Sequence, residues 1–268
     1  MSEIKNDDIK NICYNISKKI ILPKFCNLKE FDLKRKSNND LVTSVDIEVE
    51  KQLEISLKKL IPSSLFIGEE LFENNNSILD YYHEKNYCWT VDPIDGTTNY
   101  SKGKEKFAIM IGLSFRDKIL QSWIYKPLDE LMCYAINGEG SFINDIKIKS
   151  NSITELNKCK GSISKKYWSD YNSIIMHSII SKFENVSSYG CIGFEYIDIA
   201  NGNRDFTILS KLSPWDHLPG ILIAREAGGI DTYFDDGQYN FLLSHKKNLI
   251  VSGNKVLTDK IFNLIIGE

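Results

Sequence analysis

Two aspartates separated by two residues, Asp92 and Asp95, are the clearest chemical signal in this sequence. They lie in the segment WTVDPIDGTTNY, residues 89–100, where the apolar run before Asp92 predicts a buried strand that ends there. Pro93 fixes its own φ and lacks an N–H group, which favours a rigid bend with the Ile94 carbonyl directed away from the sheet. Two carboxylates and one carbonyl can then converge on one point, and hard oxygen donors of this kind suit Mg²⁺.

Gly96 and Thr97 follow directly and supply the complementary half of such a site. If a helix begins here, its free backbone N–H groups and the positive end of its dipole form an anion site beside the cations. The glycine allows a phosphate oxygen to approach closely, and the Thr97 hydroxyl can orient a water. Taken alone, the same residues are at least as typical of an ordinary turn or helix cap as of a metal and phosphate site.

Three further carboxylates stand at predicted junctions between elements. Asp46 precedes a predicted helix, Glu69 follows a predicted strand, and Asp216 occupies a predicted N-cap position. Each has an ordinary structural explanation as a cap or a loop charge. Acidic residues at four separate junctions are nevertheless more typical of one assembled metal site. His217, beside Asp216, is interpreted as supporting the helix start, with no catalytic role.

The elements that must position these residues can be predicted from apolar periodicity. Apolar residues at three- and four-residue steps predict helices near 9–20, 49–60, 193–201, 217–227 and 256–266. Short β-rich runs predict strands near 65–67, 87–91, 107–115, 119–125, 130–136 and 205–209, several of them forming a meander. Residues 34–40 are expected to form a loop or hairpin, and residues 73–77 an exposed loop.

The composition of the chain indicates a globular protein and argues against several other classes. The 268 residues carry a formal net charge of −3, with 42% apolar and 26% charged residues, which is ordinary globular usage. No apolar run approaches the ~20 residues of a membrane helix, the N-terminus is too polar for a signal peptide, and no cysteine pair has metal or redox spacing. Residues 165–168, KKYW, resemble a basic-aromatic nucleic-acid patch, but they are few and their surroundings are neutral. We therefore expect a cytoplasmic protein that requires neither membrane nor nucleic acid.

The order of these motifs resembles the inositol monophosphatase family of Mg²⁺-dependent, lithium-sensitive phosphatases. WTVDPIDGTTNY at 89–100 and PWDHLPGILIAREAGG at 214–229 carry the resemblance, supported by NDLVTSVD at 39–46 and FIGEE at 66–70. It implies an α/β fold, a layered αβαβα sandwich of the inositol monophosphatase / fructose-1,6-bisphosphatase type, usually homodimeric. A composition change near 150–160 suggests an N-terminal subdomain, 1–150, with most metal ligands and a C-terminal subdomain, 151–268, with Asp216 and the substrate side.

The resemblance also implies roles for individual residues, with two to three Mg²⁺ ions as cofactor. Glu69, Asp92 and the Ile94 carbonyl would bind one ion; Asp92, Asp95 and Asp216 a second; a looser third would share Glu69. Thr97, backed by Asp46, would activate the attacking water, so that Thr97, Asp46 and Glu69 are the catalytic candidates. Lys36 is a weaker candidate from a loop near the metals. The residues expected to contact substrate are Asp92, Ile94, Asp95, Gly96, Thr97, Gly190, Ile192 and Asp216.

The substrate is predicted less closely. Ile192 stands where the inositol enzymes usually have a small residue, and Leu209 where they commonly have a carboxylate that binds inositol hydroxyls. Loss of that acceptor weakens recognition of a polyol, and Glu195 is a candidate replacement. Hydrolysis of inositol monophosphate or a similar small phosphorylated metabolite is the first hypothesis. Action on 3′-phosphoadenosine 5′-phosphate, fructose 1,6-bisphosphate or histidinol phosphate is the second, and a regulatory protein on the same fold that contacts transcription or translation machinery is the third.

Overall fold

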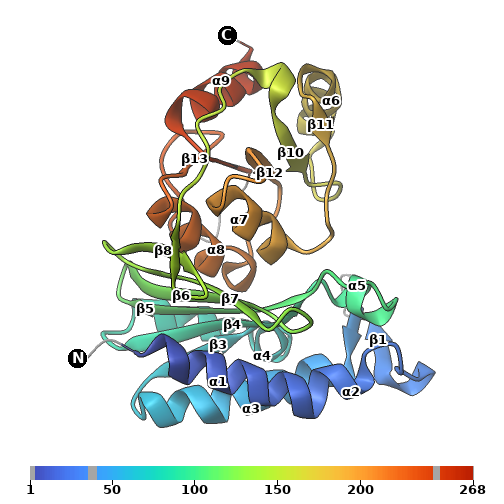
Figure 1. Cartoon of the computed structure of the whole chain (residues 1–268), viewed down its shortest axis with the longest axis vertical. Helices are drawn as coiled ribbons and strands as arrows, with labels where there is room; N and C mark the ends of the chain where they lie inside the picture. The colour runs from blue at the N-terminus through green and yellow to red at the C-terminus, as the bar shows by residue number, and fades with distance from the viewer. Residues whose placement is uncertain (1–3, 36–40, 244–247, 268) are drawn as a thin grey trace.

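The computed structural model describes residues 4–35, 41–243 and 248–267. Its N-terminal layer consists of two helical segments that lie side by side (Figure 1). The first comprises α1 (Asn6–Ile16), a π-helical turn η1 (Ser17–Ile21) and α2 (Leu22–Lys24), and the second is α3 (Ser44–Leu60). Their buried positions, including Ile9, Cys13, Leu53 and Leu57, are the apolar stripes that predicted them. Between them come the 3₁₀ turn η2 (Glu30–Asp32) and the strands β1 (Leu33–Arg35) and β2 (Leu41–Thr43). These strands pair antiparallel, and residues 36–40 of the expected loop or hairpin lie outside the described residues.

A seven-stranded sheet packs on this layer. Its strands are β3 (Leu65–Gly68), β4 (Tyr87–Asp95), β5 (Ala108–Phe115), β6 (Lys118–Lys126), β7 (Leu131–Ile136), β8 (Gly140–Ile143) and β9 (Ile146–Ile148). They lie in chain order, and every neighbouring pair is antiparallel except β3 and β4. The predicted meander is therefore confirmed. Because β3 and β4 are parallel, their carboxyl ends meet at one edge of the sheet, and this brings the residues after Gly68 beside Asp92.

The connection between β3 and β4 is helical, and the prediction of an exposed loop at 73–77 was wrong. It consists of α4 (Glu69–Asn74) and a 3₁₀ segment, η3 (Asn76–His83). Asn75 lies between them and its side chain accepts a hydrogen bond from the Ser77 N–H, so it caps the second segment. The polar residues that suggested a loop thus serve as helix ends, while Ile78 and Tyr82 are buried against the sheet.

A second sheet, of five strands, forms the other half of the molecule. Its strands are β10 (Lys160–Ile163), β11 (Asn185–Val186), β12 (Phe206–Leu209), β13 (Ile230–Tyr233) and β14 (Leu249–Ser252), in the order β11-β10-β12-β14-β13. The helices of this half are α6 (Asp170–Ile179), α7 (Ile192–Ala200), α8 (Pro214–Glu226) and α9 (Lys255–Ile266), with 3₁₀ turns η4 (Leu156–Lys158) and η5 (Ile180–Lys182). The short helix α5 (Thr97–Ser101) belongs to the first half and lies between β4 and β5, at the edge of the first sheet. β10 and β12 are parallel neighbours, so their carboxyl ends also share one edge.

Five layers result, and they are the predicted αβαβα arrangement. Figure 1 shows α1 and α3 below the seven-stranded sheet, α7 and α8 between the two sheets, and α6 with α9 beyond the five-stranded sheet. Helix α8 is buried on all sides, as is typical of a central helix with apolar residues around its whole circumference. This central layer presents the starts of α7 and α8 to the edge where β4 ends.

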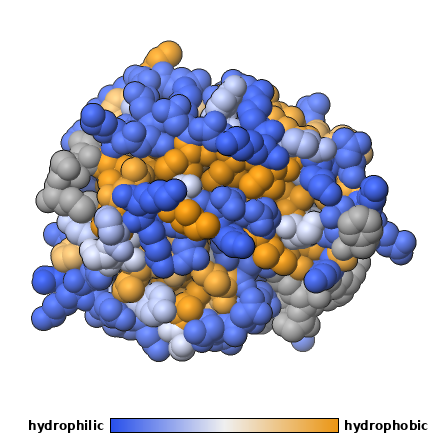
Figure 2. Space-filling model, turned by 90° about the horizontal axis from the view of Figure 1, so that it is seen from below, coloured by the Kyte–Doolittle hydropathy of each residue, from blue (hydrophilic) through white to orange (hydrophobic). Residues whose placement is uncertain are grey.

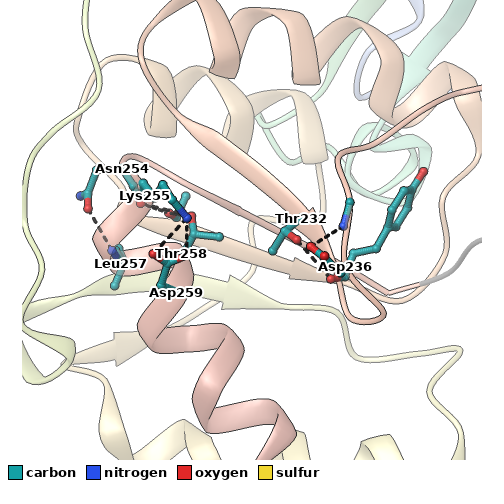
Figure 3. Close-up of polar contacts among 10 residues, drawn as sticks. Thr232, Asp236, Asn254, Lys255, Leu257, Thr258 and Asp259 are labelled. Atoms are coloured by element: carbon teal, nitrogen blue, oxygen red, sulfur yellow. Dashed lines mark hydrogen bonds and ion pairs between the residues drawn. The ribbon is translucent and has the colours of Figure 1, made fainter. Parts of the chain in front are cut away.

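The last helix is anchored by local polar contacts (Figure 3). Asn254 caps α9 by accepting a hydrogen bond from the Leu257 N–H at 2.9 Å, and Lys255 lies 2.9 Å from Asp259 one turn later.

The opposite face of the molecule, formed by α1 and α3, shows apolar patches among charged side chains (Figure 2). In the part of the chain that the structure describes, no helix has the length and apolar character needed to cross a bilayer.

Candidate metal and phosphate site

A cleft of about 420 Å³ opens where the two halves of the molecule meet the central helices. Of the predicted site residues, those that line it are Glu69, Asp92, Ile94, Asp95, Gly96, Thr97, Gly190, Ile192 and Asp216. Asp46 is not among the lining residues and is buried behind Thr97. The structure therefore brings together carboxylates that are up to 147 positions apart in the chain, from Glu69 to Asp216. Lys36 lies outside the described residues.

Asp92 is at the centre of the acidic group. Its side chain is 2% exposed and its Oδ1 accepts a hydrogen bond from the Ile94 N–H at 3.0 Å. Burial, followed by the negative charges of Glu69, Asp95 and Asp216, raises the pKa of Asp92 well above its usual range, and a hydrogen bond joins it to Asp216. Such mutual repulsion in a buried site is relieved either by a shared proton or by a bound cation.

Asp95 connects this group to the start of α7. Its carboxylate accepts hydrogen bonds from the Cys191 thiol at 2.9 Å, the Ile192 N–H at 3.1 Å and the Gly193 N–H at 2.6 Å. Burial raises the pKa of Asp95, and these three donors oppose the rise by stabilising the ionised form. Cys191 was not predicted as a site residue, although its position between Gly190 and Ile192 was a signal that could have indicated it.

Thr97 and Asp46 form the expected pair. The Thr97 hydroxyl oxygen lies 3.0 Å from Asp46 Oδ1 and 3.0 Å from the Ile94 carbonyl oxygen. The other oxygen of Asp46 accepts from the N–H and hydroxyl of Thr43, closing a capping box at the start of α3. Burial, as the largest cause, raises the pKa of Asp46 to about 6, and the charge of Glu69 adds to this rise.

The turn between Asp95 and Thr97 depends on Gly96. Its φ is +87°, in the left-handed region, and a Cβ atom there would lie 2.9 Å from the Lys106 carbonyl oxygen. Helix α5 then begins at Thr97, so the condition set for an anion site at this turn is met. The Asn99 side-chain amide lies 2.8 Å from the Lys106 carbonyl and 2.9 Å from the Tyr189 carbonyl, and so ties this turn to the segment before α7. Asn99 is a positioning residue that was not predicted.

The helix starts differ from the expectation in one consistent way. Asp46 and Asp216 were expected just before or at the N-cap, but each is the third residue of its helix, and the N-caps are Thr43 and Ser213. Glu69 was expected at the end of a strand, and it follows β3 directly as the first residue of α4. Carboxylates in a first helical turn lie beside unpaired N–H groups and the positive end of the helix dipole, which reduces the cost of gathering negative charge there.

The donor set fits a hard divalent cation. The acidic part of the cleft contains carboxylates and the Ile94 backbone carbonyl, and these are the oxygen ligands that Mg²⁺ prefers. Within the described ranges, no three His, Cys, Asp or Glu side chains are already arranged as a complete metal-binding group. The Asp92–Asp216 hydrogen bond and those that Asp95 accepts engage carboxylate oxygens that could otherwise bind a cation.

The wall opposite the acidic group contains Glu195, the suggested replacement for an inositol-binding carboxylate. It lines the cleft but is 3% exposed. One oxygen accepts from the Ser188 hydroxyl and the Tyr189 N–H, both at 2.9 Å, and the other accepts from the hydroxyls of Ser162 and Thr207. Both carboxylate oxygens are thus occupied within the protein, and Glu195 holds the wall together rather than offering an acceptor to a ligand.

His217 is a structural link in the same wall. Its Nε2 lies 2.8 Å from the Lys211 carbonyl oxygen and its Nδ1 lies 3.0 Å from the Tyr196 hydroxyl. Because a carbonyl only accepts, we assign the ring proton to Nε2 and let Nδ1 accept from the tyrosine. Burial lowers the pKa of His217 to about 4, so it is neutral in this setting. These contacts agree with a supporting role.

Buried carboxylates gathered at helix starts in an α/β sandwich are an arrangement suited to a metal-dependent phosphatase. The comparisons with known proteins identify the family to which the chain belongs. Residues 7–265 match the model of the inositol monophosphatase family, and the chain belongs to that family. It is 27% identical to inositol-1-monophosphatase of Bacillus subtilis (strain 168), over 86% of this chain and 85% of that protein.

Two further proteins show the range of the family. The chain is 30% identical to Nus factor SuhB of Vibrio cholerae, over 79% of this chain and 78% of that protein. A crystal structure of an IMPase/NADP phosphatase complexed with Mg²⁺ and phosphate superposes with a TM-score of 0.81 and 24% identity, over 97% of this chain and 94% of that chain. The predicted fold type is confirmed.

Proposed function

We propose that this protein is a Mg²⁺-dependent phosphomonoesterase that hydrolyses inositol monophosphate or a similar small phosphorylated metabolite. The observation that carries the proposal is the group of buried carboxylates around Asp92, next to the turn of Gly96 and Thr97. The acidic group would repel a phosphate unless cations were bound, and so it requires them. Mg²⁺ bound there would lower the pKa of a water and neutralise charge on the phosphate.

The roles of the ligands are those that the resemblance to the family implies, and their common place in the cleft lining supports them. We assign Glu69, Asp92 and the Ile94 carbonyl to one ion, and Asp92, Asp95 and Asp216 to a second. A third, weaker ion would share Glu69. Ion binding would displace the hydrogen bond between Asp92 and Asp216, which occupies oxygens needed as ligands. The backbone amides of Gly96 and Thr97 would bind the phosphate oxygens.

Thr97 and Asp46 are assigned to the attacking water. The Thr97 hydroxyl can donate to Asp46 while its oxygen accepts a hydrogen bond from a water in the cleft, because a hydroxyl has one proton and two lone pairs. Asp46 holds the hydroxyl in this orientation and is itself fixed by the N–H of Thr43. With Glu69 beside them, these residues orient the water rather than attack the phosphorus, which suits phosphoryl transfer to water without a covalent intermediate.

The test is phosphate release from a panel of polyol, sugar and nucleotide phosphates in the presence and absence of Mg²⁺. Asp92→Asn should abolish turnover while the fold is retained, because it removes a charge assigned to both ions; Asp117→Asn, an exposed aspartate outside the cleft, is the control. Absence of Mg²⁺-dependent release from every member of the panel by the wild-type protein would refute the proposal.

Family membership supports the remaining parts of the proposal: a cytoplasmic homodimer inhibited by lithium, with subdomains 1–150 and 151–268. The change of sheet between Ile148 and Lys160 supports that boundary. A regulatory role is the second candidate, because a relative at 30% identity is named a Nus factor. If inactive Asp92→Asn protein still rescued the phenotype of a deletion strain, the regulatory role would be favoured over catalysis.

A further inference from the structure

Cys191 is a buried residue of the cleft that has no assigned role in the proposed reaction. It is the N-cap residue of α7, is 2% exposed and belongs to the cleft lining. Its Sγ lies 2.9 Å from Asp95 Oδ2 and 3.5 Å from the Asp95 carbonyl oxygen. A thiol has one proton, and we assign it to Oδ2 because a charged carboxylate is the stronger acceptor. The thiol is therefore a hydrogen-bond donor to an assigned cation ligand.

The two carboxylate oxygens of Asp95 are used to different degrees. Oδ2 accepts from the Cys191 thiol and from the Gly193 N–H at 2.6 Å, whereas Oδ1 accepts from the Ile192 N–H at 3.1 Å. Each carboxylate oxygen has two lone pairs. Within the described part of the chain, the donors to Oδ2 thus fill its lone pairs, and one lone pair of Oδ1 is left for a cation.

The start of α7 is built to hold this carboxylate. Asn99 Nδ2 donates to the Gly190 carbonyl at 3.2 Å, immediately before Cys191. Gly193 leaves room for Asp95, because a Cβ atom at Gly193 would lie 3.0 Å from Oδ2. The backbone on both sides of Cys191 is fixed in this way, so the thiol already has its position before a cation binds. Preorganised contacts of this kind favour binding at a site.

We propose that Cys191 is a positioning residue whose thiol holds Asp95 Oδ2 and thereby directs Oδ1 to the cation. The inference rests on the proposed function, in which Asp95 is a ligand of the second ion. Mg²⁺ prefers oxygen to sulfur ligands, so the thiol acts through Asp95 rather than as a ligand itself. Groups that hydrogen-bond to a metal ligand fix its orientation, and their loss typically lowers metal affinity about 10- to 100-fold.

Two substitutions at Cys191 separate the hydrogen bond from packing. Cys191→Ala and Cys191→Ser leave side chains of nearly equal volume, and only serine can still donate to Asp95. Cys133→Ala is the matched control, because Cys133 of β7 is also buried and lies outside the cleft lining. Calorimetric titration of the metal-free proteins with MgCl₂ measures cation affinity without turnover, and urea unfolding measures the stability of each variant.

We expect Cys191→Ala to bind Mg²⁺ about tenfold more weakly than wild type or worse, and Cys191→Ser and Cys133→Ala to bind it within about threefold of wild type. The Mg²⁺ concentration that gives half-maximal turnover should rise in Cys191→Ala alone, because added metal compensates for a lower affinity. A purely structural role would lower the midpoint of urea unfolding in both alanine variants and leave Mg²⁺ affinity unchanged.

The possible outcomes keep the inference separate from the proposed function. Equal Mg²⁺ affinity in wild type and Cys191→Ala, or equal weakening in Cys191→Ala and Cys191→Ser, would overturn the inference and leave the phosphatase proposal intact. Absence of Mg²⁺ binding to the wild-type protein would refute the phosphatase proposal and the role of Cys191 with it. If Cys191→Ala does not fold, Cys191→Thr and Cys191→Val form a second pair of equal shape in which only threonine donates, and equal Mg²⁺ affinity in that pair would overturn the inference.

Discussion

At the scale of single residues, the pair Thr97–Asp46 allows a chemical role to be tested without a change in side-chain shape. The Thr97 hydroxyl has one proton and lies 3.0 Å from two acceptors, Asp46 Oδ1 and the Ile94 carbonyl. Donation to Asp46 leaves the lone pairs of the hydroxyl for a water in the cleft. Thr97→Val keeps the shape of the side chain and removes only this function.

We expect Thr97→Val to lower kcat by roughly 10²- to 10³-fold with little change in KM, which is the usual size of a positioned proton-transfer or water-orienting group. Steady-state kinetics on the preferred substrate measures both constants. Thr98→Val is the control, because Thr98 lines the same cleft from the next position and is exposed. A change in KM with kcat unaltered would contradict the assigned role, and so would an equal decrease of kcat in both variants.

At the scale of elements, the turn from β4 into α5 must place two cation ligands and an anion site within a few residues. Gly96 makes this possible through a left-handed φ and through a close approach to the Lys106 carbonyl. The register of β4 against β5 also shifts between Asp92 and Asp95. Such an irregularity redirects side chains that a regular strand would place on alternate faces. The element therefore departs from regular geometry at the position where the chemistry requires it.

Gly96→Ala should reduce stability and turnover together, since the added Cβ would meet backbone 2.9 Å away. Gly138→Ala is a matched control, because Gly138 has a similar φ of +85° but no atom within 4 Å of the added Cβ. We expect about 1 kcal/mol of destabilisation for Gly138→Ala with normal activity, and a larger loss with at least tenfold lower kcat/KM for Gly96→Ala. Denaturant unfolding measures the loss of stability, and steady-state kinetics measures kcat/KM. Equal stability and activity in the two variants would show that crowding at Gly96 is unimportant.

At the scale of the whole molecule, a buried carboxylate connects the N-terminal helices to the edge of the first sheet. Glu50 of α3 is 3% exposed and accepts hydrogen bonds from the N–H groups of Glu70 at 2.8 Å and Leu71 at 2.9 Å. It thereby fixes the start of α4, the helix that carries Glu69. Burial, with a contribution from the charge of Glu70, raises the pKa of Glu50 from 4.5 to about 8.

This raised pKa predicts a pH dependence of stability. The folded protein binds the Glu50 proton more tightly than the unfolded chain, so the contribution is present in full below pH 4.5 and is lost as the pH rises towards about 8. Glu50→Gln cannot titrate. We expect the free energy of unfolding of wild type, relative to the variant, to fall by roughly 1–3 kcal/mol between about pH 5 and pH 8. Parallel urea titrations in metal-free buffers measure the difference, and a difference that does not change with pH would contradict the prediction.

The sequence alone determined much of the fold and the inventory of the acidic site. Apolar periodicity located most helices and strands, because burial of one face leaves a regular pattern within a short segment. The junctions of Asp92, Glu69 and Asp216 were also visible, because turn and cap chemistry is local. The exact helix starts were less predictable, since Thr43 and Ser213 compete as caps with the carboxylates that follow them.

Only the tertiary structure decided what lies opposite the acidic group. Lys165 and Lys211 are 46 positions apart, and both line the cleft because β10 and β12 pair in parallel and His217 of α8 holds the second loop. Likewise, Glu195 resembled a free acceptor until its partners from three other segments were known. Pairing of distant strands leaves no mark in the local pattern of residues, because it depends on contacts that form only when the layers pack. The carboxylates of the acidic group are therefore predictable from short motifs, whereas the part of the cleft that is built from the second sheet is not.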